Sequence, residues 1–490
     1  MQTETCDVLV VGGGGSGLAA AIEAAERGAR VVLLEKNAQL GGSTAWSIGS
    51  VTATRTPHQR RKGIADDPLH HWEDMPGFAG DLDPRDNPSL RRILCDEMPE
   101  TFQWLLDSGV RFMGPMPEPP HRQPRMHNVL PNSRAFIYHL SRRARRAGVD
   151  IRTQVHVQHL RREGEVVVGV QAQTPAGERV FTARGGVVLA AGDFTNSPAL
   201  KARFMGPREA QVEAVNSTAT GDGQHMAEAL GAQILNGDLA LGPELRFMAP
   251  AQDNFLRRLP PWGWLAELMA WSVDHVPAFI LRPFMMKFLT TALAPSLGLF
   301  EQGALLVNRR GERFGAESDS PALRLPEQPD KQAFILLDAR LGQTFSSWPN
   351  FISTAPGIAY AYIDDYRRNR PDVFHEAPTL EALAAQLGMP AGALQAAVAG
   401  TRIAPAGAGP YIALGPVRAV FVHNEGGLRV DTSHRVLVGP DAKPLDGLYA
   451  AGSTGQGGLL LKGHGHHLAW AFVSGRRAGR LAAQRATGAA

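Results

Sequence analysis

Residues 7–17 read DVLVVGGGGSG, and this stretch decides the fold. Residues 8–11 form a short apolar run rich in valine, which is typical of a buried strand in a parallel sheet. Gly12, Gly14 and Gly17 follow with the spacing G-x-G-x-x-G. The first glycine of this pattern allows a sharp turn, the second lets backbone N–H groups approach a pyrophosphate, and the third lets the next helix lie close to the strand. The stretch therefore predicts a dinucleotide-binding turn.

The residues that follow complete this unit. Residues 18–27 have an alanine-rich helical pattern that ends at Gly28, and the N-terminus of such a helix favours an anion. A second apolar strand at residues 31–34 ends in Glu35, whose carboxylate can accept hydrogen bonds from both hydroxyls of an adenosine ribose. A glycine-rich turn alone is a weak signal, but strand, turn, helix, strand and acid in this order favour a bound dinucleotide over a turn without a ligand.

The length and charge of the chain indicate how many domains it has and which kinds of partner it can bind. At 490 residues it exceeds one ordinary core, so two or three domains are expected. The net charge of +3 is too small to indicate a nucleic-acid partner. The arginines within residues 142–146 alternate with apolar residues, which predicts a helix with one buried and one solvated face.

The cysteines indicate a reducing compartment. Cys6 and Cys95 cannot form a disulfide framework, so both are expected to be reduced thiols. The first strand begins by residue 7, which leaves no room for a signal peptide. We therefore expect a cytoplasmic protein.

Further segments of small residues suit additional contacts with the same ligand. GGSTAWSIG at residues 41–49 can lie against a planar ring and offer N–H and O–H donors. GVVLAAG at residues 186–192 reads as a buried strand that glycine closes. GLYAAGS at residues 447–453 repeats that pattern, and GHGHH at residues 463–467 opens a helix over residues 468–484. The C-terminal segment therefore returns to the first domain.

These segments predict an α/β fold in which a Rossmann-like dinucleotide-binding domain is split in sequence by an inserted α+β capping domain. The predicted domains are residues 1–240 and 422–490 for the two parts of the Rossmann-like domain and residues 241–421 for the capping domain. We also expect separate strands at residues 178–183 and 186–192, and a loop at residues 401–415.

Residues 259–300 differ from the rest of the chain in their aromatic residues and sparse charges. The segment holds Trp262, Trp264, Trp271 and Phe279 among other large apolar residues. Charged residues interrupt each apolar run before the roughly 18 residues that a membrane-spanning helix needs. Two interpretations remain open: a buried helical hairpin, or a surface that faces a membrane or admits a lipophilic molecule.

Seven motifs occur in a fixed order along the chain: GGGGSGLAAA, LLEKNAQLGGSTAWS, LAAGDF, TGDG, NEGGLRVD, GLYAAGS and SGRRAG. In this order and spacing they resemble the FAD-dependent fumarate reductase and succinate dehydrogenase flavoproteins and their relatives, the 3-ketosteroid dehydrogenases. The resemblance implies bound FAD, a mobile cap over its ring, and hydride transfer between flavin N5 and a C–C bond next to a carbonyl or carboxylate. The histidine that attaches flavin covalently in some relatives is replaced at Ser43-Thr44, so we expect non-covalent FAD.

The motifs and the resemblance together assign a set of cofactor contacts. The predicted residues are Gly12, Gly14, Gly15, Ser16, Gly17, Glu35, Lys36, Gly42, Ser43, Thr44, Gly49, Val155, Ala191, Gly192, Asp222, Gly452, Ser453, His467 and Leu468.

The chain departs from its relatives at the residues that carry catalysis. The arginine acid of fumarate reductases falls on Pro321, where the ketosteroid dehydrogenases have a tyrosine. His423 matches a substrate-binding histidine of fumarate reductases, and Lys462 falls where those enzymes hold a carboxylate-binding arginine. His464 follows two residues later, and histidine carries protons near neutral pH. We therefore expect Lys462, His464 and His423 to be catalytic.

Each of these residues also has a simpler interpretation. Lys462 suits an ion pair at the domain interface, His464 and its neighbours suit caps of the following helix, and His423 suits a loop hydrogen bond. The GHGHH segment lacks the ligand spacing and the separate carboxylate of a metal site, so no metal is expected.

Three functions remain open. The first is a dehydrogenase that introduces a C=C bond next to the carbonyl of an alicyclic or steroid-like substrate and passes electrons to a quinone or flavoprotein acceptor. The second is a reductase of an unsaturated carboxylate, and the third is a flavin-binding protein without catalysis. The missing arginine weighs against the second, whereas residues 259–300 favour a lipophilic substrate and peripheral contact with the inner face of a membrane. A second dinucleotide motif is absent from the sequence, so a direct nicotinamide partner is not expected.

Overall fold

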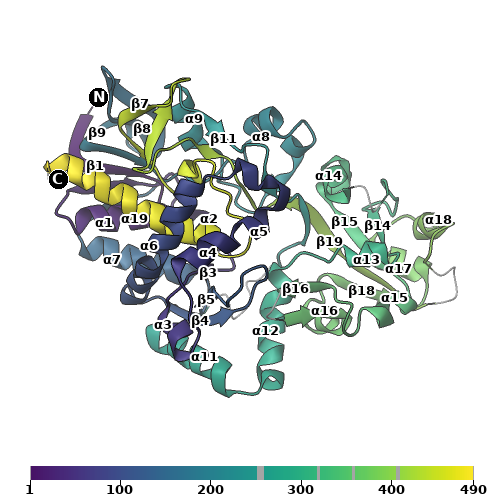
Figure 1. Cartoon of the computed structure of the whole chain (residues 1–490). Helices are drawn as coiled ribbons and strands as arrows, with labels where there is room; N and C mark the ends of the chain where they lie inside the picture. The colour runs from purple at the N-terminus through teal and green to yellow at the C-terminus, as the bar shows by residue number, and fades with distance from the viewer. Residues whose placement is uncertain (1, 251–258, 317–319, 356–358, 404–408, 489–490) are drawn as a thin grey trace.

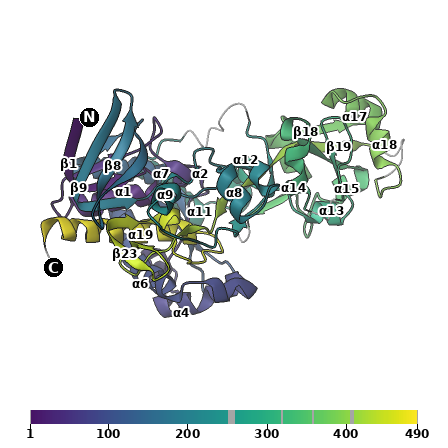
Figure 2. The ribbon, with the colours of Figure 1, turned by 90° about the horizontal axis from the view of Figure 1, so that it is seen from above.

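The computed structural model describes residues 2–250, 259–316, 320–355, 359–403 and 409–488. It has two lobes, each with its own apolar core, and the larger lobe contains both ends of the chain (Figure 1). The smaller lobe comes from the middle of the chain and extends from one end of the larger lobe (Figure 2).

The larger lobe begins with β1 (Gln2–Val11), α1 (Gly15–Ala25), β2 (Val31–Leu34), α2 (Gly42–Trp46), β3 (Ser50–Thr52), α3 (Pro57–Arg61), α4 (Pro68–Asp74), α5 (Pro76–Ala79), α6 (Pro88–Asp107), β4 (Arg111–Met116), β5 (Met126–Leu130), α7 (Arg134–Arg146), β6 (Asp150–Arg152), β7 (His156–Glu163), β8 (Val166–Thr174) and β9 (Gly177–Leu189). It continues with α8 (Pro198–Phe204), α9 (Asp222–Glu228), β11 (Ile234–Leu235) and β12 (Ala240–Leu241), and returns in β20 (His423–Asn424), β21 (Gly427–Leu428), β22 (Arg435–Val438), β23 (Lys443–Ala450) and α19 (His466–Thr487).

The smaller lobe contains β10 (Glu213–Ala214), β13 (Glu244–Phe247), α13 (Gly298–Glu301), β14 (Leu305–Asn308), α14 (Pro321–Arg324), β15 (Ala333–Leu337), α15 (Ala339–Thr344), β16 (Ser353–Ala355), β17 (Ala359–Ala361), α16 (Ile363–Asn369), β18 (Phe374–Ala377), α17 (Leu380–Leu387), α18 (Ala393–Val398) and β19 (Tyr411–Phe421). A helical hairpin lies at the lower edge of the molecule in Figure 1, with α11 (Gly263–His275) against the larger lobe and α12 (Ala278–Ala292) against the smaller lobe.

An eight-stranded sheet forms the centre of the larger lobe, with the order β22-β23-β8-β9-β1-β2-β6 and with β7 paired to β8. β1 pairs in parallel with β2 and β9, and β23 pairs in parallel with β9. Residues 8–11 are buried, as expected for a strand that is covered on both faces. The α/β fold and the split of its dinucleotide-binding domain are therefore confirmed.

Glycines of α19 allow this helix to lie directly against α1. A Cβ atom on Gly475 would lie 2.3 Å from the carbonyl oxygen of Ser16, and one on Gly479 would lie 2.1 Å from that of Ala20. Because real Cβ atoms do not approach so closely, only glycine permits this packing. The SGRRAG motif therefore holds the last helix beside the glycine-rich turn of the first.

The segment that was predicted as two strands, residues 178–183 and 186–192, forms the single strand β9. Gly186 has a φ of +111°, which lets the strand bend without ending. Before the bend β9 pairs with β8, and after it β9 pairs with β23. The glycines thus mark a change of partner rather than a break.

A six-stranded sheet centred on β19 forms the core of the smaller lobe. β13, β15 and β18 pair antiparallel with β19, and β10 pairs with it in parallel. The prediction of a loop at residues 401–415 is wrong from Tyr411 onward, because Tyr411 to Leu414 are buried apolar residues of β19. Residues 404–408 lie outside the described residues.

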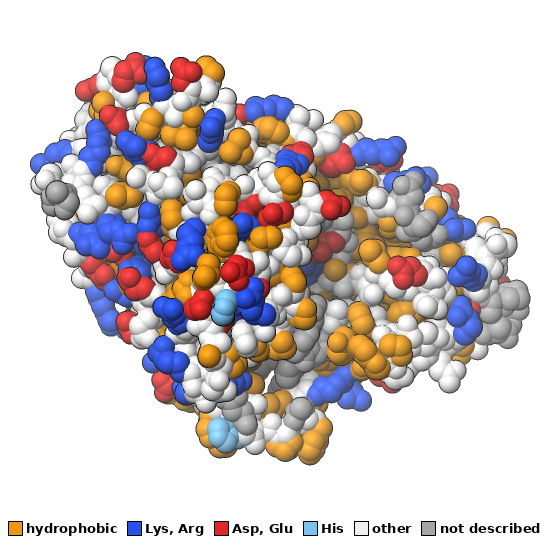
Figure 3. Space-filling view, viewed as in Figure 1, with side chains coloured by type: hydrophobic (Ala, Val, Ile, Leu, Met, Phe, Trp, Pro, Cys, Tyr) orange, Lys and Arg blue, Asp and Glu red, His pale blue; other side chains and the backbone are white. Residues whose placement is uncertain are grey.

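The hairpin of α11 and α12 exposes much of its apolar surface, which is visible at the lower edge of Figure 3. Trp264 is 62% exposed, Trp271 55% and Phe279 76%, whereas Ala266 and Met286 are buried. The prediction of a fully buried hairpin is therefore wrong. The other interpretation, an apolar surface that faces a membrane or admits a lipophilic molecule, remains. In the part of the chain that the structure describes, no helix has both the length and the apolarity to cross a membrane.

Candidate cofactor and active site

A cavity opens at the carboxyl ends of β1, β2 and β9, where parallel strands of an α/β sheet commonly bind ligands. Its walls combine the glycine-rich turn, α2, residues 155–157, residues 215–222 and the C-terminal segment. The lining residues are Val11, Gly12, Gly13, Gly14, Gly15, Ser16, Leu34, Glu35, Lys36, Asn37, Gly42, Ser43, Thr44, Trp46, Ser47, Val155, His156, Val157, Ala190, Ala191, Gly192, Asp193, Val215, Asn216, Thr218, Ala219, Asp222, Val422, His423, Ser453, His467, Leu468 and Ala471.

The three fingerprint glycines have different surroundings. Gly12 has a φ of +109°, and a Cβ there would lie 2.3 Å from the carbonyl oxygen of Ala190. A Cβ on Gly17 would lie 1.9 Å from the carbonyl oxygen of Gly12, so this residue brings α1 against the turn. The nearest atom to a Cβ on Gly14 would be the carbonyl oxygen of Gly41 at 3.8 Å, an ordinary van der Waals distance, so Gly14 is not crowded. The turn is therefore closed on the protein side and open to a ligand at Gly14, which fits a pyrophosphate.

Glu35 lies at the same edge of the sheet and is buried. Its Oε2 accepts a 2.7 Å hydrogen bond from the Gly13 N–H, and its Oε1 accepts 2.8 Å bonds from the backbone and side-chain nitrogens of Asn37. These bonds fix the carboxylate at the wall of the cavity. A carboxylate oxygen can accept more than one hydrogen bond, so the arrangement also fits a bound ribose.

Lys36 and Asp222 close the cavity on the adjacent side. The Lys36 Nζ donates hydrogen bonds of 2.6 Å to Thr220 Oγ1 and 2.8 Å to Asp222 Oδ2. Burial acts to raise the pKa of Asp222, but the hydrogen bonds from Lys36 and Thr220 lower it overall. Lys36 is the one lysine among the described residues that line this cavity, and no arginine lines it.

Three of the predicted cofactor residues, Gly17, Gly49 and Gly452, do not line the cavity. Gly17 packs α1 against the turn. A Cβ on Gly49 would lie 2.3 Å from Val129 Cγ1, so this glycine serves the packing of β5. Gly452 donates its N–H to Ser474 Oγ at 2.8 Å and lies beside Ser16. The other predicted cofactor residues all line it.

Two histidines of the C-terminal segment meet in the wall of the cavity. The ring centroids of His423 and His467 are 3.8 Å apart, and His467 Nε2 lies 3.5 Å from Oε1 of the buried Glu425. Oε2 of Glu425 accepts hydrogen bonds from Gln456 Nε2 at 2.5 Å and from the Leu461 N–H at 3.1 Å. Oε1 of Glu425 and Nε2 of His467 have no hydrogen-bond partner in the described parts of the chain.

Burial and charge set the protonation of this group. Burial, followed by the neighbouring His467, lowers the pKa of His423 well below its usual range. Burial opposes ionisation of Glu425, but the charge of the neighbouring His467 lowers the pKa of this carboxyl to about 2. The group therefore places the neutral His423 imidazole beside His467 and the buried Glu425 carboxylate, an arrangement that can hold and move a proton. The sequence analysis missed Glu425, although it stands two residues after His423 in the NEGG motif.

Lys462 and His464 lie on the loop before α19 but are not among the lining residues. The Lys462 carbonyl accepts a 2.5 Å hydrogen bond from His466 Nδ1. His464 Nδ1 lies 2.5 Å from Glu118 Oε1, which also accepts the His464 N–H at 2.9 Å. The hydrogen bond to Glu118 raises the pKa of His464, although burial opposes this. Nothing in the sequence pairs Glu118 with this loop, since it comes from the proline-rich segment before β5.

Pro321 is buried at the start of α14 in the smaller lobe and offers no group for proton exchange. Arg324 ends the same short helix and lies beside Gly315, where a Cβ would come within 1.9 Å of the Arg324 Nη1. Neither residue lines the cavity.

The comparisons with known proteins identify the family of the chain. The chain matches the family described as FAD binding domain over residues 7–247 and 280–460. It is 26% identical to NADH:fumarate oxidoreductase of Klebsiella pneumoniae, over 98% of this chain and 48% of that protein. It is also 26% identical to vinyl phenol reductase of Lactiplantibacillus plantarum, over 98% of this chain and 97% of that protein. The chain thus spans about half of the first relative and nearly all of the second.

Solved structures show the same relationship. The open conformation of a flavocytochrome c3 fumarate reductase has a TM-score of 0.72 and 25% identity, with 99% of this chain and 79% of that chain covered. The 3-ketosteroid-Δ4-(5α)-dehydrogenase of Rhodococcus jostii RHA1 has a TM-score of 0.60 and 25% identity, with 98% and 97% covered.

The split Rossmann-like domain and the cavity at its strand ends define a flavoprotein, and FAD is its cofactor. The chain belongs to the FAD binding domain family, and it is an FAD-dependent oxidoreductase related to the fumarate reductases and the 3-ketosteroid dehydrogenases.

Proposed function

We propose that the protein is a dehydrogenase that introduces a C=C bond next to the carbonyl of a lipophilic alicyclic or steroid-like substrate. FAD, when bound, supplies the hydride acceptor for this reaction. The observation that carries the proposal is Pro321, which is buried at the start of α14 and has no group for proton exchange where the resemblance places the arginine acid of the fumarate reductases. A reductase of an unsaturated carboxylate needs such an acid, whereas a dehydrogenase needs a base for the proton next to the carbonyl.

His423, His467 and Glu425 are the residues that we propose for the proton chemistry. His467, an imidazole in the cavity wall, can accept the proton that leaves the carbon next to the carbonyl. The Glu425 carboxylate, 3.5 Å from His467 Nε2, stabilises the imidazolium that forms. Lys462 and His464 remain candidates for the polar end of a substrate that extends beyond the cavity.

A reductase of an unsaturated carboxylate is the second candidate. Two relatives are named for such reactions: NADH:fumarate oxidoreductase, and urocanate reductase of Eggerthella lenta, which is 25% identical over 92% of this chain and 70% of that protein. The basic loop that holds Lys462 and His464 favours this reaction if the substrate carboxylate binds there. A flavin-binding protein without catalysis is the third, and we place it last because the cavity contains histidines that can exchange protons.

The electron acceptor of the first function is a quinone or another flavoprotein in this proposal, since the sequence has a single dinucleotide fingerprint. We also propose that FAD is bound non-covalently and that the protein works in the cytoplasm, peripheral to the inner face of the membrane. Acid precipitation tests the first of these statements: flavin should appear in the supernatant as FAD, and yellow colour in the pellet would show a covalent bond.

The function can be tested by mixing the oxidised holoenzyme anaerobically with cyclic ketones, steroids and saturated dicarboxylates. We expect cyclic ketones or steroids to bleach the flavin absorbance, and we expect His467→Asn to slow the bleaching. If no compound bleaches the flavin, but fumarate or urocanate reoxidises the photoreduced enzyme, the second function holds. Failure of both half-reactions would leave the flavin-binding function.

A further inference from the structure

His464 and Glu118 form a carboxylate–imidazole pair beside the N-terminus of α19. His464 lies on the loop before this helix, and Glu118 lies in the connection between β4 and β5. An ionised carboxylate only accepts hydrogen bonds, so His464 Nδ1, 2.5 Å from Glu118 Oε1, carries a hydrogen and donates it. The backbone N–H of His464 donates to the same oxygen at 2.9 Å. These two bonds fix the ring and leave Nε2 as its nitrogen for another partner.

The two members of the pair differ in their exposure. The side chain of Glu118 is 9% exposed, whereas that of His464 is 49% exposed. Because Glu118 covers the Nδ1 side of the ring, the opposite side, which carries Nε2, is the side that a ligand can reach. A buried carboxylate behind a half-exposed imidazole holds that ring in one tautomer and one orientation.

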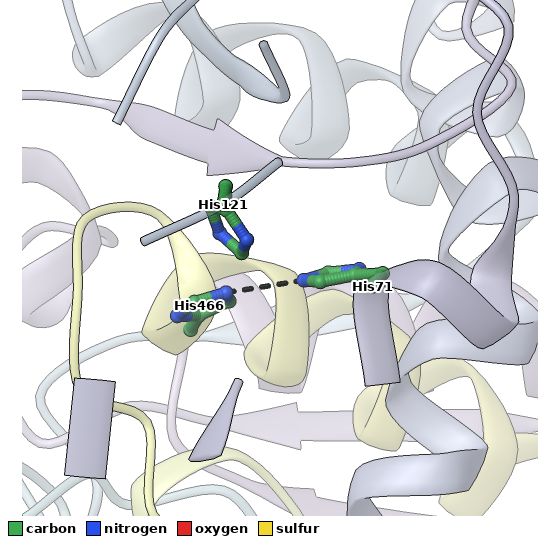
Figure 4. Close-up of side chains that lie close together, drawn as sticks. All are labelled: His71, His121 and His466. Atoms are coloured by element: carbon green, nitrogen blue, oxygen red, sulfur yellow. Dashed lines mark hydrogen bonds between the residues drawn. The ribbon is translucent and has the colours of Figure 1, made fainter. Parts of the chain in front are cut away.

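Three buried histidines hold the segments that carry this pair (Figure 4). His466 Nδ1 donates to the Lys462 carbonyl at 2.5 Å, so its Nε2 accepts the hydrogen of His71 Nε2 at 3.1 Å. The backbone N–H of His121 donates to the Glu118 carbonyl at 3.0 Å. The ring of His121 packs against those of His71 and His466, with centroids 5.2 and 5.3 Å away. The loop and the segment of Glu118 are therefore fixed against each other, which sets the geometry of the pair before a ligand binds.

His464 lies at the junction of the two lobes, next to the cavity. It is close enough for charge interaction to His423 in the cavity wall and to Glu244, which begins β13 of the smaller lobe. Glu244 pairs with Val420 of β19, and His423 follows that strand directly. The two groups near His464 therefore belong to neighbouring strands where the chain passes between the lobes.

The charges around His464 favour its protonated form. The hydrogen bond to Glu118 raises the pKa of His464 against the effect of burial, and the charges of Glu118 and Glu244 act in the same direction. Lys462 lies two residues earlier on the same loop. The neighbouring rings of His423 and His466 stay neutral, because burial lowers the pKa of His423 well below its usual range and that of His466 to about 4. His464 can therefore donate through Nε2 over a wider pH range than an ordinary histidine.

We propose that His464 polarises the carbonyl oxygen of the substrate through Nε2–H, with Glu118 as its positioning residue; this inference rests on the proposed dehydrogenase. The hydrogen bond strengthens as negative charge develops on that oxygen. In this reaction the carbon next to the carbonyl gives its proton to His467, and the following carbon gives a hydride to FAD, so that a C=C bond forms between the two carbons. His464 keeps its own proton throughout.

Binding of pentafluorophenolate to the oxidised holoenzyme tests this donor without turnover. This phenol is ionised throughout the neutral range, and its oxygen resembles the enolate oxygen of a reacting ketone. Titration is followed by the change in flavin absorbance, which also reports that each variant is folded. We expect His464→Gln to bind the phenolate on the order of 10-fold or more weakly than the wild type at neutral pH, because a charge-assisted hydrogen bond is lost. His159→Gln, which changes an exposed histidine of β7, is the control and should bind as the wild type does.

Glu118→Gln tests the positioning role through the pH profile. In the wild type, phenolate binding should weaken as pH rises through the raised pKa of His464, because the ring then loses its proton. Without the Glu118 carboxylate this loss should begin at lower pH, whereas a merely structural role of Glu118 would weaken binding equally at every pH. Glu165→Gln, at an exposed turn, is the matched control and should keep the wild-type profile.

The outcomes separate this inference from the proposed function. Equal phenolate affinity in His464→Gln and the wild type, or a wild type that does not bind the phenolate, would overturn the donor. An unchanged pH profile in Glu118→Gln would overturn the role of Glu118. If phenolate binding depends on His464 but no ketone bleaches the flavin, the donor is supported and the dehydrogenase is not. If a ketone bleaches His464→Gln as fast as the wild type, the dehydrogenase is supported and the donor is overturned.

Discussion

Glu35 has two roles: it accepts hydrogen bonds from other residues of the protein, and it is proposed to bind the ribose of FAD. Its two carboxylate oxygens already accept hydrogen bonds from Gly13 and Asn37, which shape the turn that faces the cavity. A change at this residue therefore alters both the ribose contact and the turn.

Glu35→Gln should weaken FAD binding by about 1–3 kcal/mol, because it replaces charge-assisted hydrogen bonds with weaker ones and places an amide donor against N–H groups. FAD affinity can be measured by fluorescence after removal of the cofactor. Glu165→Gln, at an exposed turn between β7 and β8, is the control and should bind FAD as the wild type does. Equal affinities for all three proteins would show that Glu35 does not contact the cofactor.

His467→Asn should reduce turnover on the order of 10²-fold or more while the flavin spectrum stays intact, because the proposed base is lost and the cavity is not. Glu425→Gln should also lower turnover, since a neutral amide stabilises an imidazolium less well. Lys462→Ala is the informative comparison. If it costs as much as His467→Asn, the substrate reaches the loop, and the carboxylate reductase becomes the better proposal.

His464 and Glu118 predict a pH-dependent part of the stability. Because Glu118 raises the folded-state pKa of His464 above its ordinary value of 6.5, the pair stabilises the fold fully below about pH 6.5 and loses this effect as pH rises through the raised pKa. Urea unfolding from about pH 6 to about pH 9 should show wild type more stable than Glu118→Gln at the acidic end, with the difference vanishing at the alkaline end. A difference that grows with pH would contradict the assignment.

Site residues could be predicted from the sequence where they stand at a fixed position relative to a strand or turn, and not where they meet through tertiary packing. Gly12 and Glu35 stand at fixed positions relative to a strand, so their places in the cavity could be inferred without the fold. Glu118, His71 and His121 could not, because each meets the C-terminal loop only through tertiary packing. His423 and His467, which were both predicted as site residues, line the cavity, whereas Lys462 and His464 lie on the loop before α19 and do not line it.

The contact between α1 and α19 depends on Gly479, because this residue has no side chain to separate the two helices. Gly479→Ala places a Cβ 2.1 Å from the Ala20 carbonyl oxygen, so the helices must separate and the free energy of unfolding should fall by about 1–3 kcal/mol. Gly263→Ala at the start of α11, where a Cβ meets no atom within 4 Å, is the control. Equal loss in both variants would point to a general effect of alanine rather than to this packing.

The α11–α12 hairpin carries exposed aromatic side chains beside basic ones. Trp262 and Trp264 share a shallow depression with Arg142 of α7, a combination that suits an anionic lipid surface. The double change Trp264→Ser and Trp271→Ser should abolish flotation with anionic phospholipid vesicles. Trp348→Ser, in the smaller lobe and with Trp348 62% exposed, should float as the wild type does. A wild type that stays unbound at low salt would contradict membrane contact.

Elements were predictable where one pattern dominates. The strand at residues 31–34 has its predicted bounds, and the C-terminal helix extends only a few residues beyond the predicted residues 468–484, because no competing pattern interrupts either segment. β9 was divided at glycines that bend rather than end it, and the start of β19 was read as loop because Pro410 and Gly415 flank four buried apolar residues.

At the scale of the whole molecule, the two lobes and the split dinucleotide-binding domain followed from motifs at both ends of the chain. The chain path between them did not, because residues 205–250 contain short strands whose partners lie in distant segments. β10, for example, comes before the predicted boundary at residue 240 but pairs with β19 of the smaller lobe.

The pairing of β9 with β23 sets an order for biosynthesis. Until the ribosome has released β23, β9 pairs in parallel only with β1 among the described strands, its other edge at residues 187–189 is unpaired, and the cavity lacks the wall that Ser453 and His467 provide. The smaller lobe, which lies between these strands in sequence, can form its own core during that interval. FAD must therefore be captured late, after the last helix has emerged, and a nascent chain that waits for its cofactor presents an unpaired sheet edge to the chaperones around it.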